Sequence, residues 1–204
     1  MRLVLASASP ARRQVLTRAG LHPEVIVSGV DESGTSAATP AELAAKLAEL
    51  KARAVLKRIE VTGPTVLVGC DSVLEFDGVA YGKPLTAERA TERWQALRGR
   101  SGILHTGHQV FALGLPGRAD WNSNAVGSTT VHFADLTDAE IDGYVATGEP
   151  LQVAGAFTLD GFGGAFIERV EGDPHNVVGI SLPLLRSMLV EIGLNWPDLW
   201  SRAP

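Results

Sequence analysis

Hydrophobic residues near the N-terminus fall into short runs that alternate with longer amphipathic stretches. Residues 2–6 form a mostly apolar run that stops abruptly at a polar segment, which predicts a short β-strand. A helix is predicted directly after it, because Ser9 suits an N-cap, Pro10 suits the first helical turn and Gly20 suits a C-terminal stop. A second strand is expected over residues 24–28.

The next third of the chain carries the clearest helix signal. Thr39 and Glu42 form a capping box ahead of an alanine- and leucine-rich stretch, so residues 40–60 are predicted to be helical. Residues 65–70 are almost continuously apolar, which is typical of a strand buried on both faces, and Asp71 is expected at the end of that strand.

The remaining pattern completes an alternation of strands and helices. The Asp77–Gly78 pair predicts a hairpin turn. Further elements are expected as strands over 79–81, 103–113 and 125–133 and as helices over 87–97, 138–147 and 183–192. The glycine-rich segment 154–164 is interpreted as backbone that packs near a ligand or as sharply bent strands. This alternation without a sequence repeat predicts an α/β fold with a mixed sheet.

Composition narrows the class of protein. Of 204 residues, 45% are apolar and 20% are charged, which indicates a globular chain rather than a disordered one. The formal net charge of −5 argues against a protein that coats nucleic acid. The single cysteine, Cys70, suits a reducing compartment, so a cytoplasmic protein is expected. No apolar run approaches the ~20 residues that span a bilayer, so no membrane partner is expected.

The first loop is a candidate anion site. A strand that leads directly into a helix directs free backbone N–H groups and the positive end of the helix dipole at the loop. Ser7 and Ser9 add hydroxyl groups, and Arg12 and Arg13 add guanidinium groups that suit phosphate oxygens. The alternative is an ordinary N-cap followed by exposed arginines.

Two acids and two lysines form the second candidate constellation. Glu32 and Asp71 follow predicted strands, where two carboxylates can hold Mg²⁺ or Mn²⁺, although such acids often only cap turns or helices. The chain has only four lysines, and Lys83 lies in a constrained Gly-Lys-Pro loop from which it could reach a phosphate. Lys51 lies on the predicted helix 40–60, where spacing alone favours a solvated charge.

Several sequence blocks, taken together and in order, resemble the Maf family of nucleoside triphosphate pyrophosphatases, also called septum formation inhibitor proteins. The blocks are residues 3–10 with Arg12, 30–32, 51–52, 69–72, 82–84, 144–150 and 154–157. The resemblance covers residues 1 to about 190 and leaves a tail at 195–204. It implies one domain over residues 1–204 with an elongated, mixed-sheet α/β fold, similar to the inosine triphosphate pyrophosphatases, and a cleft between two lobes that share one core. It also implies a divalent cation, Mg²⁺ or Mn²⁺, and a possible homodimer.

The resemblance also implies a reaction and roles for the candidate residues. The phosphates of a nucleoside triphosphate would lie against the first loop, with the metal bridging them to Glu32 and Asp71. Water would attack the α-phosphorus and release a nucleoside monophosphate and pyrophosphate. Asp71 would accept the proton of that water, while Lys51 and Lys83 would offset the charge on the reacting phosphates. An ordinary aspartate is a weak base, so the scheme requires metal.

The base of the substrate is suggested by residue 160. Family members similar to the thymidine and uridine triphosphate enzymes carry glutamine in this block, whereas the branch acting on 7-methylguanosine triphosphate carries an acid. Asp160 therefore favours guanine, because a carboxylate can accept from both N1–H and the amino group. Ala11 lacks the aromatic face that would stack on a methylated base. Pyrimidine, guanine and 7-methylguanine nucleotides all stay open.

Two other functions are compatible with the same residues. One is a non-catalytic, nucleotide-binding regulator of cell division, suggested by the historical name of the family. The other is a nucleotidyl or sugar-phosphate transferase that uses the same anion loop.

Overall fold

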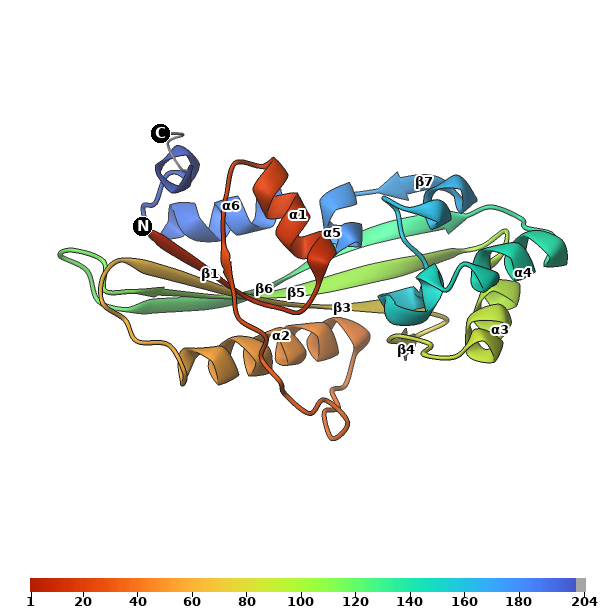
Figure 1. Cartoon of the computed structure of the whole chain (residues 1–204), viewed down its shortest axis with the longest axis horizontal. Coiled ribbons are helices and arrows are strands. Elements are labelled where there is room, and N and C mark those ends of the chain that lie inside the picture. Colours follow the sequence, from red (N-terminus) through yellow and green to blue (C-terminus); the bar gives the residue numbers. More distant parts are fainter. Residues whose placement is uncertain (201–204) are drawn as a thin grey trace.

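The computed structural model describes residues 1–200, which form an elongated molecule along a seven-stranded sheet (Figure 1). The strand order is β2-β1-β3-β5-β6-β7, and β4 also pairs with β3. Pairing is parallel in β2-β1-β3 and antiparallel elsewhere, so the predicted mixed α/β sheet is confirmed. The strands are β1 (Arg2–Ala6), β2 (Glu24–Val25), β3 (Thr65–Phe76), β4 (Val79–Tyr81), β5 (Ser101–Leu113), β6 (Trp121–Phe133) and β7 (Ile167–Glu171).

Six α-helices and four short 3₁₀ helices lie around the described part of the sheet. The α-helices are α1 (Pro10–Arg18), α2 (Pro40–Leu56), α3 (Ala87–Leu97), α4 (Asp138–Ala146), α5 (Pro174–Val178) and α6 (Leu182–Glu191). The 3₁₀ helices are η1 (Glu149–Gln152), η2 (Ala154–Ala156), η3 (Phe162–Phe166) and η4 (Trp196–Leu199). No helix within residues 1–200 is both long enough and apolar enough to cross a bilayer.

The structure corrects several predicted boundaries. Strand β2 has two residues rather than five, because it pairs only with Val4 and Leu5 at the edge of the sheet. Helix α2 ends at Leu56 rather than at residue 60. Strand β3 continues well past Asp71, so the prediction that this acid ends a strand is wrong. The physical reason is the ladder with β5, which holds β3 in extended conformation through its polar residues.

The segment 154–164 does not form bent strands. It folds into compact turns, η2 and part of η3. The predicted tail begins beside η4, and residues 201–204 of that tail lie outside the described residues.

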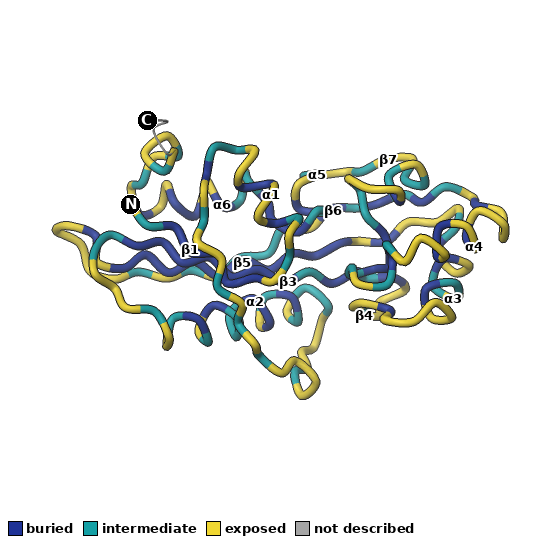
Figure 2. Tube along the Cα trace, viewed as in Figure 1, coloured by how far each residue is buried: buried dark blue, intermediate teal, exposed yellow. Residues whose placement is uncertain are grey.

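Hydrophobic cores lie on both faces of the sheet and at its far end. Helices α1 and α6 cover one face, and α2 covers the other (Figure 1). At the far end, α3 packs against α4. Trp94 of α3 lies edge-on against Phe133, Tyr144 and Phe166 at centroid distances of 5.6, 5.5 and 6.0 Å. Strands β3 and β5 are buried along much of their length (Figure 2), and β3, β5 and β6 contribute to cores at both ends. Both ends of the molecule are therefore built on the same sheet.

Two glycines determine how closely α2 lies on the sheet. A Cβ atom on Gly69 of β3 would lie 2.7 Å from the backbone oxygen of Ala48. A Cβ atom on Gly107 of β5 would overlap the backbone of Ala44. Because neither glycine has a side chain, α2 lies directly on β3 and β5 and carries Lys51 to the sheet surface.

Candidate active site

The candidate site lies at a break in one edge of the sheet. Strand β1 pairs with β3 as far as Ala6 opposite Gly69, and β4 pairs with β3 from Tyr81 opposite Leu74 onward. Between them, residues 70–73 of β3 pair with β5 on one side only within the described chain. Ligands of α/β proteins gather where a parallel strand ends, and here the strand that ends is β1.

The side chain of Arg12, a residue of α1, connects three segments of the chain at this break. The residue is buried, and its side chain makes three hydrogen bonds to three parts of the chain. Nη1 donates to Ser7 Oγ at 3.2 Å, Nη2 donates to Ser72 Oγ at 3.0 Å, and Nε donates to the backbone oxygen of Gly179 at 2.7 Å. A guanidinium has five N–H donors, so the group can also meet an anion at the break.

The N-terminus of α1 has the predicted cap. Ser9 Oγ accepts from the backbone N–H of Arg12 at 3.4 Å, and the backbone N–H of Ser9 donates to Ser7 Oγ at 3.1 Å. Ser7 is buried, whereas Ser9 is half-buried. The two serine hydroxyls therefore lie next to each other at the positive end of a nine-residue helix.

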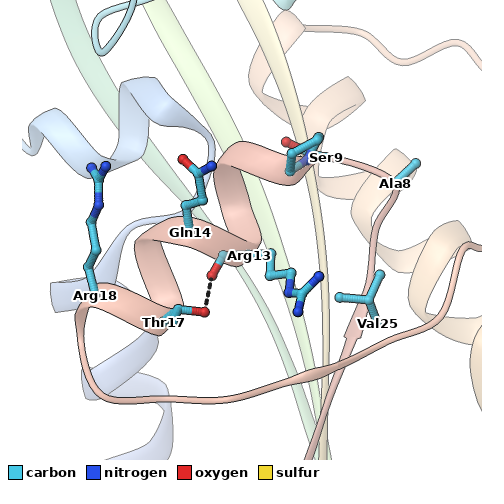
Figure 3. Close-up of a pocket in the computed structure, with 8 residues that line it drawn as sticks. Ala8, Ser9, Arg13, Gln14, Thr17, Arg18 and Val25 are labelled. Carbon is cyan, nitrogen blue, oxygen red and sulfur yellow. Dashed lines mark hydrogen bonds between the residues drawn. The ribbon is translucent and has the colours of Figure 1, made fainter.

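A cavity of about 550 Å³ opens beside Ser9 along the outer side of α1 (Figure 3). Arg13 and Arg18 line it together with Ala8, Ser9, Pro10, Gln14, Thr17 and Val25. In Figure 3 the Arg13 side chain extends toward Val25, away from Gln14. The predicted substrate residue Arg13 is thus on the same helix end as Ser9 but faces a cavity and not the Arg12 network.

Lys51 lies between the two predicted metal ligands. Its Nζ is 2.8 Å from Glu32 Oε1 and also contacts Asp71 Oδ1. The side chains of Lys51 and Asp71 are only 14% and 12% exposed, while that of Glu32 is 45% exposed. The structure therefore brings three of the four predicted catalytic residues into one cluster, with Glu32 at its solvent side.

Burial changes the acid strength of Asp71. Removal of the carboxyl group from water raises its pKa, and the positive charges of Lys51 and Arg12 act in the opposite direction without cancelling the rise. The carboxylate is consequently a stronger base than a free aspartate.

The oxygen donors of Glu32 and Asp71 suit a hard divalent cation. Within residues 1–200, no group of three or more His, Cys, Asp and Glu side chains is close enough to hold a metal ion. Mg²⁺ is commonly bound by only one or two carboxylates together with substrate phosphates, so two carboxylates that meet at one ammonium group fit this mode. They do not fit a preformed protein cage.

Lys83 and Asp160 lie on two other loops. Lys83 is exposed, and its loop is fixed by Gly82, whose oxygen accepts from Arg93 Nη1 at 2.6 Å and from the backbone N–H of Gly155 at 3.2 Å. Asp160 is exposed and lines a cavity of about 290 Å³ formed largely by α1, α5 and α6. Neither side chain forms an ion pair with the Lys51 cluster in the described structure.

Comparison with known proteins identifies the family. A model of the Maf-like protein family matches residues 2–192. The chain belongs to this family. A relative from Salinispora tropica is 57% identical over 204 residues, covering 99% of this chain and 88% of its own length. One from Streptomyces coelicolor is 56% identical over 202 residues, covering 99% and 96%. Both are named nucleoside triphosphate pyrophosphatase.

Among solved structures, that of the Staphylococcus aureus Ham1 protein matches with a TM-score of 0.46 and 16% sequence identity. The match covers 94% of this chain and 100% of that chain. The assignment to the Maf-like family rests on the sequence matches alone.

The site of this Maf-like protein contains residues that the sequence did not indicate. Ser72 Oγ lies 2.9 Å from Thr106 Oγ1, which donates to the backbone oxygen of Asn176 at 2.8 Å. This chain of hydrogen bonds extends the contact between Arg12 and β3 into β5 and α5. Ser72 belongs to the sequence block 69–72 and follows Asp71 directly. Thr106 reaches the site because it pairs with Ser72 across β3 and β5, and Asn176 reaches it through hydrogen bonds between α5 and β5.

Proposed function

We propose that this Maf-like protein is a nucleoside triphosphate pyrophosphatase. In this reaction the oxygen of water bonds to the α-phosphorus, the bond between that phosphorus and the bridging oxygen to the β-phosphate breaks, and pyrophosphate leaves. The proposal is supported by the names of relatives that are more than 50% identical. The observation that carries it is the contact of Lys51 with both Glu32 and Asp71, next to Ser72, which accepts a hydrogen bond from Arg12 in the first turn of α1.

The phosphate tail would bind at the N-terminus of α1. The hydroxyls of Ser7 and Ser9 lie at this helix end beside Arg12, whose guanidinium reaches Ser72 at the break in the sheet, and polar groups at a helix N-terminus bind phosphate well. Arg12 holds this arrangement and offers its remaining N–H groups, while Arg13 can meet an outer phosphate from the adjacent cavity.

Asp71 would act as the proton acceptor for the attacking water. A general base works best when its pKa approaches the working pH, and burial moves the pKa of Asp71 in that direction. Lys51 would hold the carboxylate in place and offset negative charge as the α-phosphorus is attacked. Lys83 would approach the phosphates from its exposed loop.

Glu32 and Asp71 would hold Mg²⁺ or Mn²⁺ together with phosphate oxygens of the substrate. When bound, such a cation makes water more acidic and neutralises phosphate charge. Lys51 already lies between the two carboxylates, so its ammonium group must share them with the cation or move toward the phosphates.

Asp160 would select the base. Its carboxylate is exposed at a cavity whose wall includes the apolar side chains of Val15, Leu159 and Val178. A base edge that offers two N–H donors, as guanine does, would satisfy both carboxylate oxygens. We therefore propose guanine-type nucleotides, including modified ones, as the preferred substrates.

The deciding experiment incubates the purified chain with a panel of nucleoside triphosphates and Mn²⁺ and separates the products. Nucleoside monophosphate and pyrophosphate are expected in equal amounts. Release of orthophosphate with a diphosphate, or no turnover, would overturn the proposal. An adduct formed with an added acceptor would identify a transferase, and nucleotide binding without turnover would identify a regulator.

A further inference from the structure

The carboxylate of Glu149, at the start of η1, accepts four hydrogen bonds from this chain. Oε1 accepts from the hydroxyl of Tyr144 at 2.9 Å, from Thr158 Oγ1 at 2.5 Å and from the backbone N–H of Gly163 at 3.0 Å. Oε2 accepts from the backbone N–H of Phe162 at 3.0 Å. A carboxylate has about four acceptor sites, so these contacts within the chain use most of the hydrogen-bonding capacity of Glu149.

Three of the four donors belong to one short segment, residues 158–163. Thr158 precedes Asp160 in the sequence, and Phe162 and Gly163 follow it. Glu149 is therefore hydrogen-bonded to residues on both sides of Asp160 in the sequence. The side chain of Asp160 itself is exposed at the cavity beside α1.

Close packing shows that this loop is fitted to the carboxylate. A Cβ atom on Gly161 would overlap Glu149 Oε2. A Cβ atom on Gly163 would lie 2.5 Å from the hydroxyl oxygen of Tyr144 and 2.7 Å from the backbone oxygen of Thr158. The segment can approach Glu149 this closely because both positions lack a side chain.

The same region also contacts the loop of Lys83. The backbone N–H of Leu85 donates to the oxygen of Leu151 in η1 at 3.0 Å, and that of Gly155 in η2 donates to Gly82 at 3.2 Å. The turns that begin at Glu149 therefore contact both the loop of Lys83 and the loop of Asp160, the two predicted site residues outside the Lys51 cluster.

We infer that Glu149 is a positioning residue for base selection, holding residues 158–163 so that Asp160 faces the base of the bound nucleotide. This inference rests on the proposed function. Glu149 acts through Asp160 and does not touch the substrate. Loss of the carboxylate frees the loop, so the KM for the preferred base rises, while the Lys51 cluster and kcat change little.

The test compares Glu149→Gln with the native chain on guanosine and uridine triphosphates. The amide keeps one oxygen but places an NH₂ group against N–H and O–H donors. The ratio of kcat/KM for guanosine triphosphate to that for uridine triphosphate is expected to fall about tenfold, mainly through a higher KM for guanosine triphosphate. This is the size of effect expected for one charge-assisted hydrogen bond. Glu140→Gln is the matched control, because Glu140 also accepts a backbone N–H, that of Thr137 at 2.8 Å, without touching the loop. An unchanged ratio in folded Glu149→Gln overturns the inference.

A milder pair of variants keeps the test decisive if Glu149→Gln fails to fold. Thr158→Val removes one of the four donors, and Thr158→Ser keeps the hydroxyl group. The valine variant is expected to lower the ratio of kcat/KM for guanosine over uridine triphosphate, and the serine variant is expected to keep the native ratio. Equal ratios in the two variants would overturn the inference.

Two readouts separate this inference from the proposed function. Hydrogen exchange at the amides of Phe162 and Gly163 is expected to be slow in the native chain and faster in Glu149→Gln. Binding of non-hydrolysable guanosine and uridine triphosphate analogues is expected to lose selectivity in the same variant. If the native chain binds these analogues selectively without hydrolysing triphosphates, the proposed function fails and the binding ratio still decides the inference. No selective binding by the native chain would overturn the inference.

Discussion

Asp71 lies directly opposite Gly107 in the antiparallel ladder of β3 and β5. The acid that we propose as the base and the glycine that seats α2 are therefore cross-strand neighbours. The absence of a side chain at Gly107 lets the backbone of α2 rest on the sheet, and α2 supplies Lys51 to Asp71.

Gly107→Ala is expected to push α2 away from the sheet. The new methyl group would overlap backbone atoms of Ala44, which cannot rotate away as a side chain could. Overpacking of this kind costs about 1–3 kcal/mol, and the displaced Lys51 should also lower the rate of hydrolysis. Thermal unfolding and initial rates measure both effects.

Gly143→Ala is the matched control for this substitution. A Cβ atom on Gly143 would meet no other atom within 4 Å, and the residue lies within helix α4. The control should be neutral or stabilised by up to about 1 kcal/mol. Equal stability of the Gly107 and Gly143 variants would contradict the proposed seating of α2.

Asp71→Asn is expected to reduce hydrolysis by about 10² to 10⁴-fold. The amide has nearly the same shape but cannot accept the proton of water, and it leaves Lys51 paired with Glu32 alone. Release of pyrophosphate measures the loss, and circular dichroism checks the fold. The exposed Asp142 provides the control Asp142→Asn, which should keep full activity. Near-native activity of the Asp71 variant would assign the base to another group.

Glu32→Gln is expected to raise the Mn²⁺ concentration needed for half-maximal activity by about tenfold or more. Activity should disappear in excess chelator and return when Mg²⁺ or Mn²⁺ is added. Glu49→Gln is a fair comparison, because Glu49 pairs with Arg53 on the exposed side of α2. The same metal requirement in both variants would show that Glu32 is not a ligand.

His108 makes the stability of the fold sensitive to mild acid. Burial lowers its pKa to about 4 from an ordinary value of 6.5. Its Nε2 accepts from the backbone N–H of Ser181 at 2.8 Å, a bond that requires this nitrogen to be unprotonated, and Nδ1 lies 2.9 Å from the backbone oxygen of Thr106. The neutral ring therefore fits its site and the charged ring does not.

The expected pH dependence follows from this difference in proton binding. Between pH 6.5 and about 4 the unfolded chain binds a proton that the folded chain excludes, so the free energy of unfolding falls as the pH is lowered. The slope approaches about 1.4 kcal/mol per pH unit at most. Urea unfolding between pH 7 and 5 measures it. His108→Gln should flatten the dependence of the free energy of unfolding on pH in this range. His22→Gln, which changes an exposed histidine, should leave this dependence unchanged.

Local features of the fold could be predicted from the sequence, and contacts between distant segments could not. The N-cap at Ser9 and the capping box at Thr39 each depend on residues three positions apart, and both are present. The length of β3 depends instead on pairing with β5, which lies about 40 residues further along the chain. A polar pair such as Asp71 and Ser72 looks like a strand end until that partner is known.

The candidate site divides in the same way. The sequence blocks of the family pointed to Glu32, Lys51 and Asp71, and the structure brings them into contact. The contact itself depends on how α2 lies on the sheet, which spacing along the chain does not reveal. Glu149 lies in the sequence block 144–150, but its role could not be predicted, because three of its four donors come from residues 158–163 and no pattern along the chain links them to it.

Asp160→Gln is expected to shift the preference toward uridine and thymidine triphosphates relative to guanine nucleotides. An ionised carboxylate only accepts hydrogen bonds, so it suits the adjacent N–H donors of guanine. An amide both donates and accepts, as the edge of a pyrimidine with alternating carbonyl and N–H groups requires. The ratio of kcat/KM for the two nucleotide classes should change by about tenfold or more, since each mismatched polar contact costs on the order of 1–3 kcal/mol. Glu168→Gln removes an exposed acid from β7 and should leave the ratio unchanged. If both variants keep the native order of preference, the base is read by a residue other than Asp160.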